Sequence, residues 1–147
     1  MVCDSRSVLF DYCEMISAEH FIKGIDGFGR GGSMRNLLVH VANSSQYWIG
    51  NHCFSLGIPS LLYTAYCTVA ECRQLFRKTD ELVYQLLDKF EDDYNKPITS
   101  SRGDQLTKAS PLKVFLHAIT HEYHHKGQIV SISRQLGYSP VDTDVIR

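Results

Sequence analysis

One long helix is predicted from Ser110 to Gly137, and this segment constrains the fold most. Ser110 is a good N-cap residue and Pro111 suits the first helical position, while Gly137 with Pro140 beyond it is typical of a helix end. Between these limits, apolar residues recur at helical spacing on two roughly opposite sides. A helix that is apolar on two sides is buried on two sides, so this one needs packing partners on both.

Three further helices are predicted from the same spacing of apolar residues, each bounded by polar or Gly-rich sequence. They run from about Ser5 to Lys23 (with Met15 and Ile22 on the inward side), from Ser33 as N-cap, and from about Thr68 to Phe90. The connection 95–110 is polar and irregular, while the stretch SLLYTAY in the connection 54–67 could be extended. An all-α fold is expected: a four-helix bundle with two long connections, forming a single domain over residues 1–147.

Composition limits the classes of partner. The chain has 15 Lys and Arg against 16 Asp and Glu, without a basic run longer than a dipeptide, so a nucleic-acid partner is not expected. No apolar run approaches the roughly 18 residues that a membrane helix needs, and the N-terminal residues do not resemble a secretion signal. Five cysteines without a Cys-x-x-Cys pattern fit a reduced chain, so a cytoplasmic location is expected.

Two histidines of the long helix, His121 and His125, are predicted to project side by side, because residues four apart differ by only about 40° around the axis. That spacing lets two imidazoles share one metal ion. The pair shares its helix face with residues that should point inward, namely Val114, Ala118, Ile132 and Leu136. Unpaired polar groups are costly to bury, which favours a metal. Two histidines on an exposed polar face are the alternative interpretation.

A third histidine, His40, interrupts the apolar run NLLVHVA on an inward helix face. A lone histidine there is more often a core residue bonded to a neighbour. Three histidines on inward faces of two helices favour a metal site, because helix bundles build such sites between facing helices. His117, one turn before His121, is either a donor close to the site or an ordinary helix-face residue. Surface positions are expected for His20, His52 and His124.

The segment HEYHH contains His-Glu-x-x-His, the pattern of zinc peptidases, but that class needs a third ligand after the helix. No Glu follows His125 in the chain. The extended version of the pattern also fails, because Gln128 and Ser131 stand at its Gly and His positions. A peptidase is therefore excluded by its missing ligand.

Several segments resemble the DinB/YfiT-like superfamily: LLVHVANSSQYW, then HEYHHKGQIVSISRQLG followed by SPVDTDVI. The resemblance runs from about Ser33 to Ile146, and Lys126 stands where the family usually has Arg. It implies a four-helix bundle that holds a divalent metal on three histidines. In this chain the ligands would be His40, His121 and His125.

Three neutral ligands leave a divalent ion its full charge and an open coordination position, which is typical of catalytic sites. A water or thiol bound there loses its proton more readily. Five residues are candidates for groups close to the metal or facing the substrate, although each could equally serve packing or helix-face hydrogen bonding: Ser44, Tyr47, His117, Glu122 and Gln128. No catalytic residue beyond the metal ligands is predicted.

Family members with assigned activity include metal-dependent thiol S-transferases and a thiol-dependent isomerase. The resemblance therefore implies an enzyme with one divalent ion per chain, zinc or nickel first and manganese or iron as alternatives. Its partners would be a small-molecule substrate and a low-molecular-weight thiol. A metal-dependent hydrolase that uses bound water, and a non-catalytic metal- or ligand-binding protein, are the alternative functions.

A homodimer is also expected. The second apolar side of the long helix consists of Leu112, Leu116, Ile119, Tyr123 and Val130, and the family commonly forms dimers. Gly127 beside this stripe would let another backbone approach closely. The competing explanation is that the long connections cover the stripe within one chain.

Overall fold

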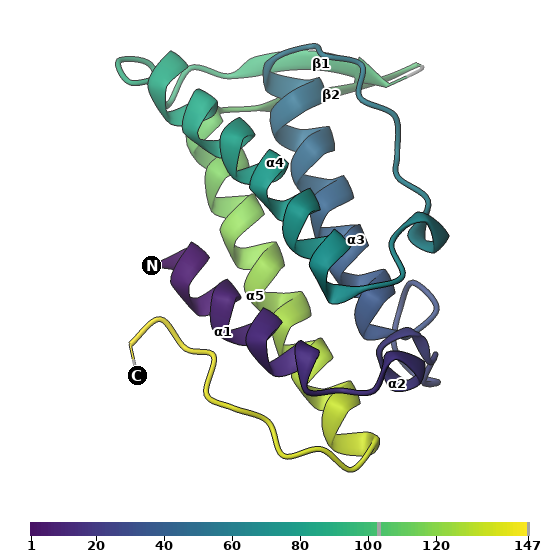
Figure 1. The fold of residues 1–147 in the computed structure, drawn as a ribbon. Coiled ribbons are helices and arrows are strands. Elements are labelled where there is room, and N and C mark those ends of the chain that lie inside the picture. The colour runs from purple at the N-terminus through teal and green to yellow at the C-terminus, as the bar shows by residue number, and fades with distance from the viewer. Residues whose placement is uncertain (103, 147) are drawn as a thin grey trace.

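Long helices lie side by side, and a small hairpin lies at one end of the molecule, away from the N-terminal helix (Figure 1). The computed structural model describes residues 1–102 and 104–146. Its elements are α1 (Val2–Glu14), α2 (Ala18–Ile22), α3 (Met34–Ser45), the π-helix η1 (Gln46–Cys53), the 3-10 helix η2 (Tyr63–Ala65), α4 (Val69–Lys89), β1 (Ile98–Arg102), β2 (Gln105–Ala109) and α5 (Pro111–Gln135). The chain is thus mostly helical. Among the described residues, no helix is both long enough and apolar enough to span a bilayer.

Three helices begin where the sequence predicts. The side chains of Ser33, Thr68 and Ser110 each accept a hydrogen bond from the backbone N–H three residues on, which satisfies a donor that the helix itself cannot pair. At the far end of α5, Gly137 adopts a φ of +89°, a conformation that other residues rarely reach. These caps fix the lengths of α3, α4 and α5.

The first predicted helix is interrupted. α1 ends at Glu14, and Ser17 starts the short α2 by accepting a hydrogen bond from the backbone of His20. Met15 is 66% exposed and Ile22 is 44% exposed, so the expectation that both lie on an inward face is wrong. The break reflects Ser17, because a serine that caps a new helix competes with continuation of the old one.

The connection before α5 is a β-hairpin, so an all-α fold with an irregular segment here is wrong. β1 and β2 pair antiparallel, with Ile98 opposite Ala109 and Thr99 opposite Lys108. Burial alternates along β2, where Thr107 and Ala109 face inward and Lys108 faces solvent. Most inward positions of the hairpin carry small or polar side chains. The sequence of this segment therefore lacks the alternation of apolar and polar residues that predicts a strand.

His52 fastens this hairpin to η1, although the sequence analysis placed it at the surface. Its ring is only 2% exposed. Nε2 lies 3.4 Å from the carbonyl oxygen of Ala109, and Nδ1 contacts the hydroxyl of Ser100. A carbonyl oxygen can only accept, so Nε2 carries the proton and Nδ1 accepts from Ser100. A small apolar cluster under the hairpin, with Ile49, Leu86, Ala109 and Val114 among its members, supports the same contact.

The other long connection is held by two asparagines. Asn43 bonds both the N–H and the carbonyl of Leu61, at 2.7 and 3.0 Å. Asn51 does the same to Ile58, at 2.6 and 2.9 Å. Each side-chain amide satisfies a backbone donor and an acceptor at once, as a neighbouring strand would. The connection is therefore tied along one helix rather than left as a free loop.

Replacing Ser100 by Ala is expected to lower the free energy of unfolding by about 1 to 3 kcal/mol, because the buried Nδ1 of His52 loses its partner. Ser101, which is exposed on the same strand, provides the matched control, and Ser101→Ala should change stability by less than about 0.5 kcal/mol. Urea unfolding followed by circular dichroism measures both variants. Equal changes would contradict an anchoring role for His52.

Candidate metal centre

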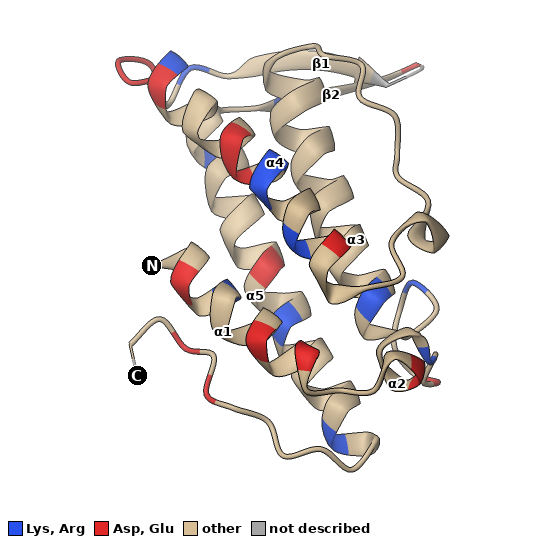
Figure 2. Cartoon of the chain, in the orientation of Figure 1, with Lys and Arg blue, Asp and Glu red and all other residues tan. Residues whose placement is uncertain are grey.

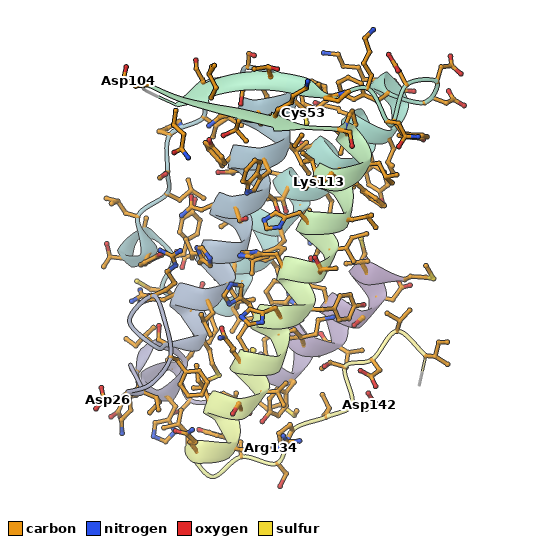
Figure 3. All side chains as sticks on the ribbon, turned by 180° about the vertical axis from the view of Figure 1, so that it is seen from behind. Asp26, Cys53, Asp104, Lys113, Arg134 and Asp142 are labelled. Atoms are coloured by element: carbon orange, nitrogen blue, oxygen red, sulfur yellow. The ribbon has the colours of Figure 1, made fainter. Side chains whose placement is uncertain are left out.

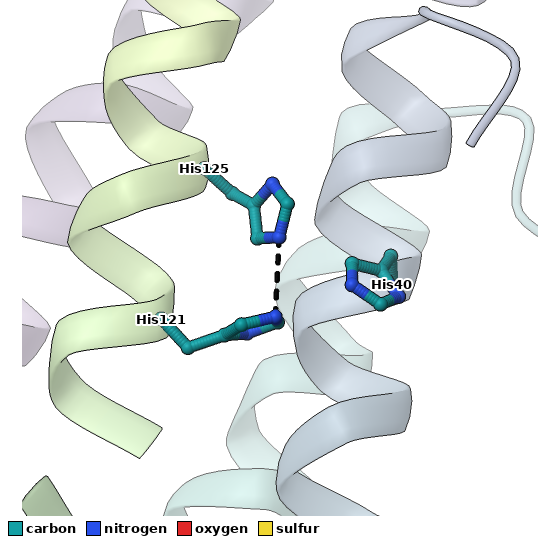
Figure 4. Close-up of side chains that lie close together, drawn as sticks. All are labelled: His40, His121 and His125. Atoms are coloured by element: carbon teal, nitrogen blue, oxygen red, sulfur yellow. Dashed lines mark hydrogen bonds between the residues drawn. The ribbon is translucent and has the colours of Figure 1, made fainter. Parts of the chain in front are cut away.

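Packing of α3 against α5 brings three histidines together (Figure 4). His40 comes from α3, and His121 and His125 come from successive turns of α5. The ring centroids are 5.0 Å apart for His40 and His121, 4.8 Å for His40 and His125, and 4.4 Å for His121 and His125. One nitrogen from each ring lies within 4.8 Å of the other two. Three donors that close can share a single ion.

The spacing of the two α5 donors matches metal geometry. The Nε2 atoms of His121 and His125 are 3.1 Å apart. Two nitrogens at roughly 2.0 to 2.1 Å from a tetrahedral ion would be separated by about 3.3 Å. Binding therefore requires only a small separation of the two rings. The two nitrogens also lie within hydrogen-bond distance of each other.

Gln128 orients one of these rings. Its side-chain oxygen lies 2.7 Å from Nδ1 of His125, one helical turn earlier. An amide oxygen can only accept, so Nδ1 of His125 carries the proton and Nε2 is left with a lone pair. A histidine ligand usually has such a partner on its second nitrogen, which fixes both tautomer and ring direction. The predicted role of Gln128 near the site fits this contact.

The three imidazoles are neutral near pH 7. Partial burial, followed by the charges of Arg30 and His125, lowers the pKa of His40 to about 4. Burial and then the neighbouring imidazoles lower the pKa of His121 to about 3. For His125, burial also lowers the pKa, and it outweighs the hydrogen bond that Nδ1–H donates to Gln128, which raises the pKa. Neutral imidazole is the form that binds metal. An ion would therefore not have to compete with protons for charged imidazolium rings at this site.

Three of the other predicted residues lie on the two helices that carry the cluster or on η1, which continues α3. Ser44 is half-buried on α3, one turn after His40. Tyr47 is half-buried on η1, with its ring 5.1 Å from that of Trp48. His117 is exposed, and its ring is 5.3 Å from the ring of His121. His117 is thus a direct neighbour of a candidate ligand.

Glu122 does not join the cluster, although it was a candidate for this site. Its two carboxylate oxygens accept hydrogen bonds from Nε and Nη2 of Arg6, at 2.9 and 2.8 Å. Asp80 of α4 pairs with Nη1 of the same guanidinium at 2.7 Å. All three groups are largely buried, and the two carboxylates raise the pKa of Arg6 although burial alone would lower it. Glu122 therefore ties α5 to α1 and α4.

A cavity of about 170 Å³ lies over this ion network, lined in part by Arg6, Asp80, Glu122 and the apolar residues Val83 and Phe115. None of the three clustered histidines lines it. It is therefore separate from the candidate metal centre. Sequence inspection missed both Arg6 and Asp80, and only the placement of an arginine among the apolar residues of α1 could have pointed to a buried pair.

Comparison with protein-family models gives a match to the DinB family over residues 2–147, which is essentially the whole chain. The chain belongs to the DinB family. A search of curated proteins gives no match. DinB-family proteins generally bind a metal, and a set of three imidazoles within reach of one ion fits that property. The family match also includes α1, which lies outside the stretch that carried the sequence resemblance.

Metal analysis tests the centre directly. Protein purified without affinity resin is expected to hold close to one divalent ion per chain, and His40→Ala and His125→Ala should lose it because each removes a donor. Gln128→Ala should weaken affinity by about 10- to 100-fold, since it only frees the ring of His125. His124→Ala, an exposed neighbour, and Glu122→Gln are the controls, and both should keep the metal.

The two controls separate metal binding from stability. Glu122→Gln is expected to lower the free energy of unfolding by about 2 to 4 kcal/mol, because it removes one partner of a buried charge. Unchanged metal content in both His40→Ala and His125→Ala would rule out the centre. Loss of metal in Glu122→Gln while the protein remains folded would instead place Glu122 at the ion.

Proposed function

We propose that this DinB-family chain is a metal-dependent enzyme that activates a small thiol and transfers it to an electrophilic small molecule. The donor set supports this most directly. In the described part of the chain, the group of side chains that could hold one ion consists of His40, His121 and His125, without a fourth Cys, Asp or Glu. Structural zinc sites are usually closed by four protein ligands, whereas catalytic sites keep one position for water or substrate.

A divalent ion on these histidines, zinc or nickel first and manganese or iron as alternatives, would lower the pKa of a thiol that it binds. The chain's own residues shape the site around it. Gln128 holds the ring of His125, and partial burial keeps all three imidazoles neutral. The ring of His117 stands beside the cluster, 5.3 Å from the ring of His121 and 5.5 Å from that of Trp48.

A reducing, cytoplasmic environment is part of the proposal, because all five cysteines are free thiols. The expected partners are a small-molecule substrate and a low-molecular-weight thiol, and neither nucleic acid nor a membrane is expected. We also propose that the fold is the four-helix bundle that the resemblance implies. Its helices would be α1, α3, α4 and α5, with η1 extending α3.

Thiol transfer can be assayed with the metal-loaded protein, a chlorodinitrobenzene as electrophile and bacillithiol, glutathione or cysteine as cosubstrate. Transfer should exceed the uncatalysed rate with at least one thiol and disappear in His121→Ala. His124→Ala, the exposed neighbour on the same helix, should retain activity. Metal-dependent ester or amide hydrolysis without thiol transfer would reassign the chain as a hydrolase. Inactivity in both assays with metal bound would leave a non-catalytic binding protein.

We also propose that the chain forms a homodimer through the exposed half of the second apolar stripe on α5. Leu112 is 38% exposed and Leu116 is 51% exposed, whereas Val130 is only 9% exposed and is covered within the chain. A side chain added at Gly127 would meet no atom within 4 Å, so another backbone has room there. Exposed apolar residues in such a row are typical of an interface.

Light scattering at micromolar concentration should give the mass of a dimer. Leu116→Glu should shift it to a monomer, because a charge would be buried in the contact. Leu106→Glu, on a hairpin residue that is 74% exposed, is the control and should leave the mass unchanged. A monomer mass for the unaltered protein would contradict the dimer.

A further inference from the structure

A cavity of about 150 Å³ lies between the hairpin and the start of α5. Its walls come from three elements: Trp48 from η1, residues 107–109 from β2, and Lys113, Val114 and His117 from α5. Figure 3 shows Lys113 at the hairpin end of α5. The cavity is thus built where a helix, a strand and the π-helix meet.

The cavity adjoins the histidine cluster through His117. The ring of His117 is 5.5 Å from the ring of Trp48, which lines the cavity, and 5.3 Å from the ring of His121, a candidate ligand. A single exposed imidazole therefore separates the two spaces.

The rim of this cavity is positively charged. Lys108 and Lys113 are both exposed, and neither forms an ion pair with a carboxylate among residues 1–102 and 104–146. Arg30 adds a positive charge on the other side of the cluster, where it acts on His40 and His125. A loaded metal would increase this charge further.

Acidic residues are missing from the same region of the sequence. Residues 36–70, which form most of α3, all of η1 and the tied connection, contain no Asp, Glu, Lys or Arg, and they are drawn in tan in Figure 2. Between Asp104 and Asp142 the only acidic residue is Glu122, and its carboxylate is paired with Arg6. The two stretches of chain that supply the cluster and the walls of the cavity therefore contain lysines and imidazoles but no carboxylate apart from Glu122.

We propose that this cavity binds the electrophilic substrate and selects a small anion with a flat apolar body, such as an aromatic carboxylate. Trp48 and Val114 would pack against the apolar body, and Lys108 and Lys113 would pair with the negative group. That the bound anion is the substrate rests on the function proposed above, whereas the binding of the anion does not. The volume admits about one aromatic ring, since cavities of about 150 Å³ accommodate benzene.

Trp48 is the only tryptophan of the chain, so its indole N–H gives one resonance that reports on the cavity. That resonance would be followed during titration with benzoate and with benzamide, which match in shape and differ in charge. The titrations use chelator-treated and zinc-loaded protein. Benzoate is expected to bind at least about 3-fold more tightly than benzamide in both forms, since two exposed lysines contribute modestly to pairing.

The double variant Lys108→Gln with Lys113→Gln should weaken benzoate binding by about 2- to 10-fold and leave benzamide unchanged. Lys23→Gln with Lys78→Gln, two exposed lysines that do not line the cavity, makes the same change in net charge and should have no effect. The comparison separates a local contact from a general effect of charge.

Equal affinities for benzoate and benzamide, or no saturable shift with either, would overturn the proposal. So would benzoate binding that needs zinc, because the carboxylate would then be a metal ligand rather than a partner of the lysines. Lysine-dependent binding in a protein that fails to transfer thiols would refute the proposed function and leave this inference standing. Thiol transfer by a protein that binds benzoate and benzamide equally well would refute this inference and leave the proposed function standing.

Discussion

The contact between α3 and α5 is the interaction on which the candidate site depends, because His40 comes from one helix and His121 and His125 from the other. Imidazoles placed between packed helices are costly unless they gain a partner. The register of α5 is fixed from its other side, where Arg6 joins Glu122 and Asp80 in a buried ion network. His121 and Glu122 are adjacent in sequence and differ by about 100° around the helix. One residue can therefore face the donors while the next anchors the helix, and the Glu of the peptidase-like pattern has a structural role here.

The π-helix η1 explains how one long helix contributes side chains both to the histidine cluster and to the contact with the hairpin. α3 continues into η1 without a break, so His40 lies in the α-helical part and Trp48 and His52 lie in the π-helical part. Bonding from residue i to i+5 puts more residues into each turn, so successive side chains rotate by less than in an α-helix. Trp48 then reaches the cavity beside His117, while His52 is buried against Ser100 and Ala109. Short π-helical segments within α-helices are frequent at functional sites.

Local chemistry made part of this structure predictable. Cap residues and apolar spacing located the starts of α3, α4 and α5, and the i to i+4 spacing on α5 led to the grouping of its histidines with His40. The hairpin was missed because its inward positions, such as Ser100 and Thr107, are polar and its Leu106 is 74% exposed. The Arg6–Glu122 pair joins residues 116 positions apart, and no local pattern reports such a contact. The π-helix is also absent from the prediction, because the apolar spacing of so short a segment does not distinguish it from a continuing α-helix.

Charge distinguishes this centre from the carboxylate-rich metal sites that other helix bundles build. Glutamate ligands would neutralise much of the charge of a divalent ion, whereas His40, His121 and His125 are neutral donors. The surrounding sequence keeps that charge uncompensated, since residues 36–70 carry no acid and Glu122 is paired with Arg6. A thiol gains from such a site because its anionic form is stabilised. An anionic acceptor would gain too, yet it would repel a thiolate if both depended on the same cation. In the proposed arrangement, separate lysines at the hairpin cavity would avoid this conflict, because they would hold the negative group of the acceptor one imidazole away from the ion.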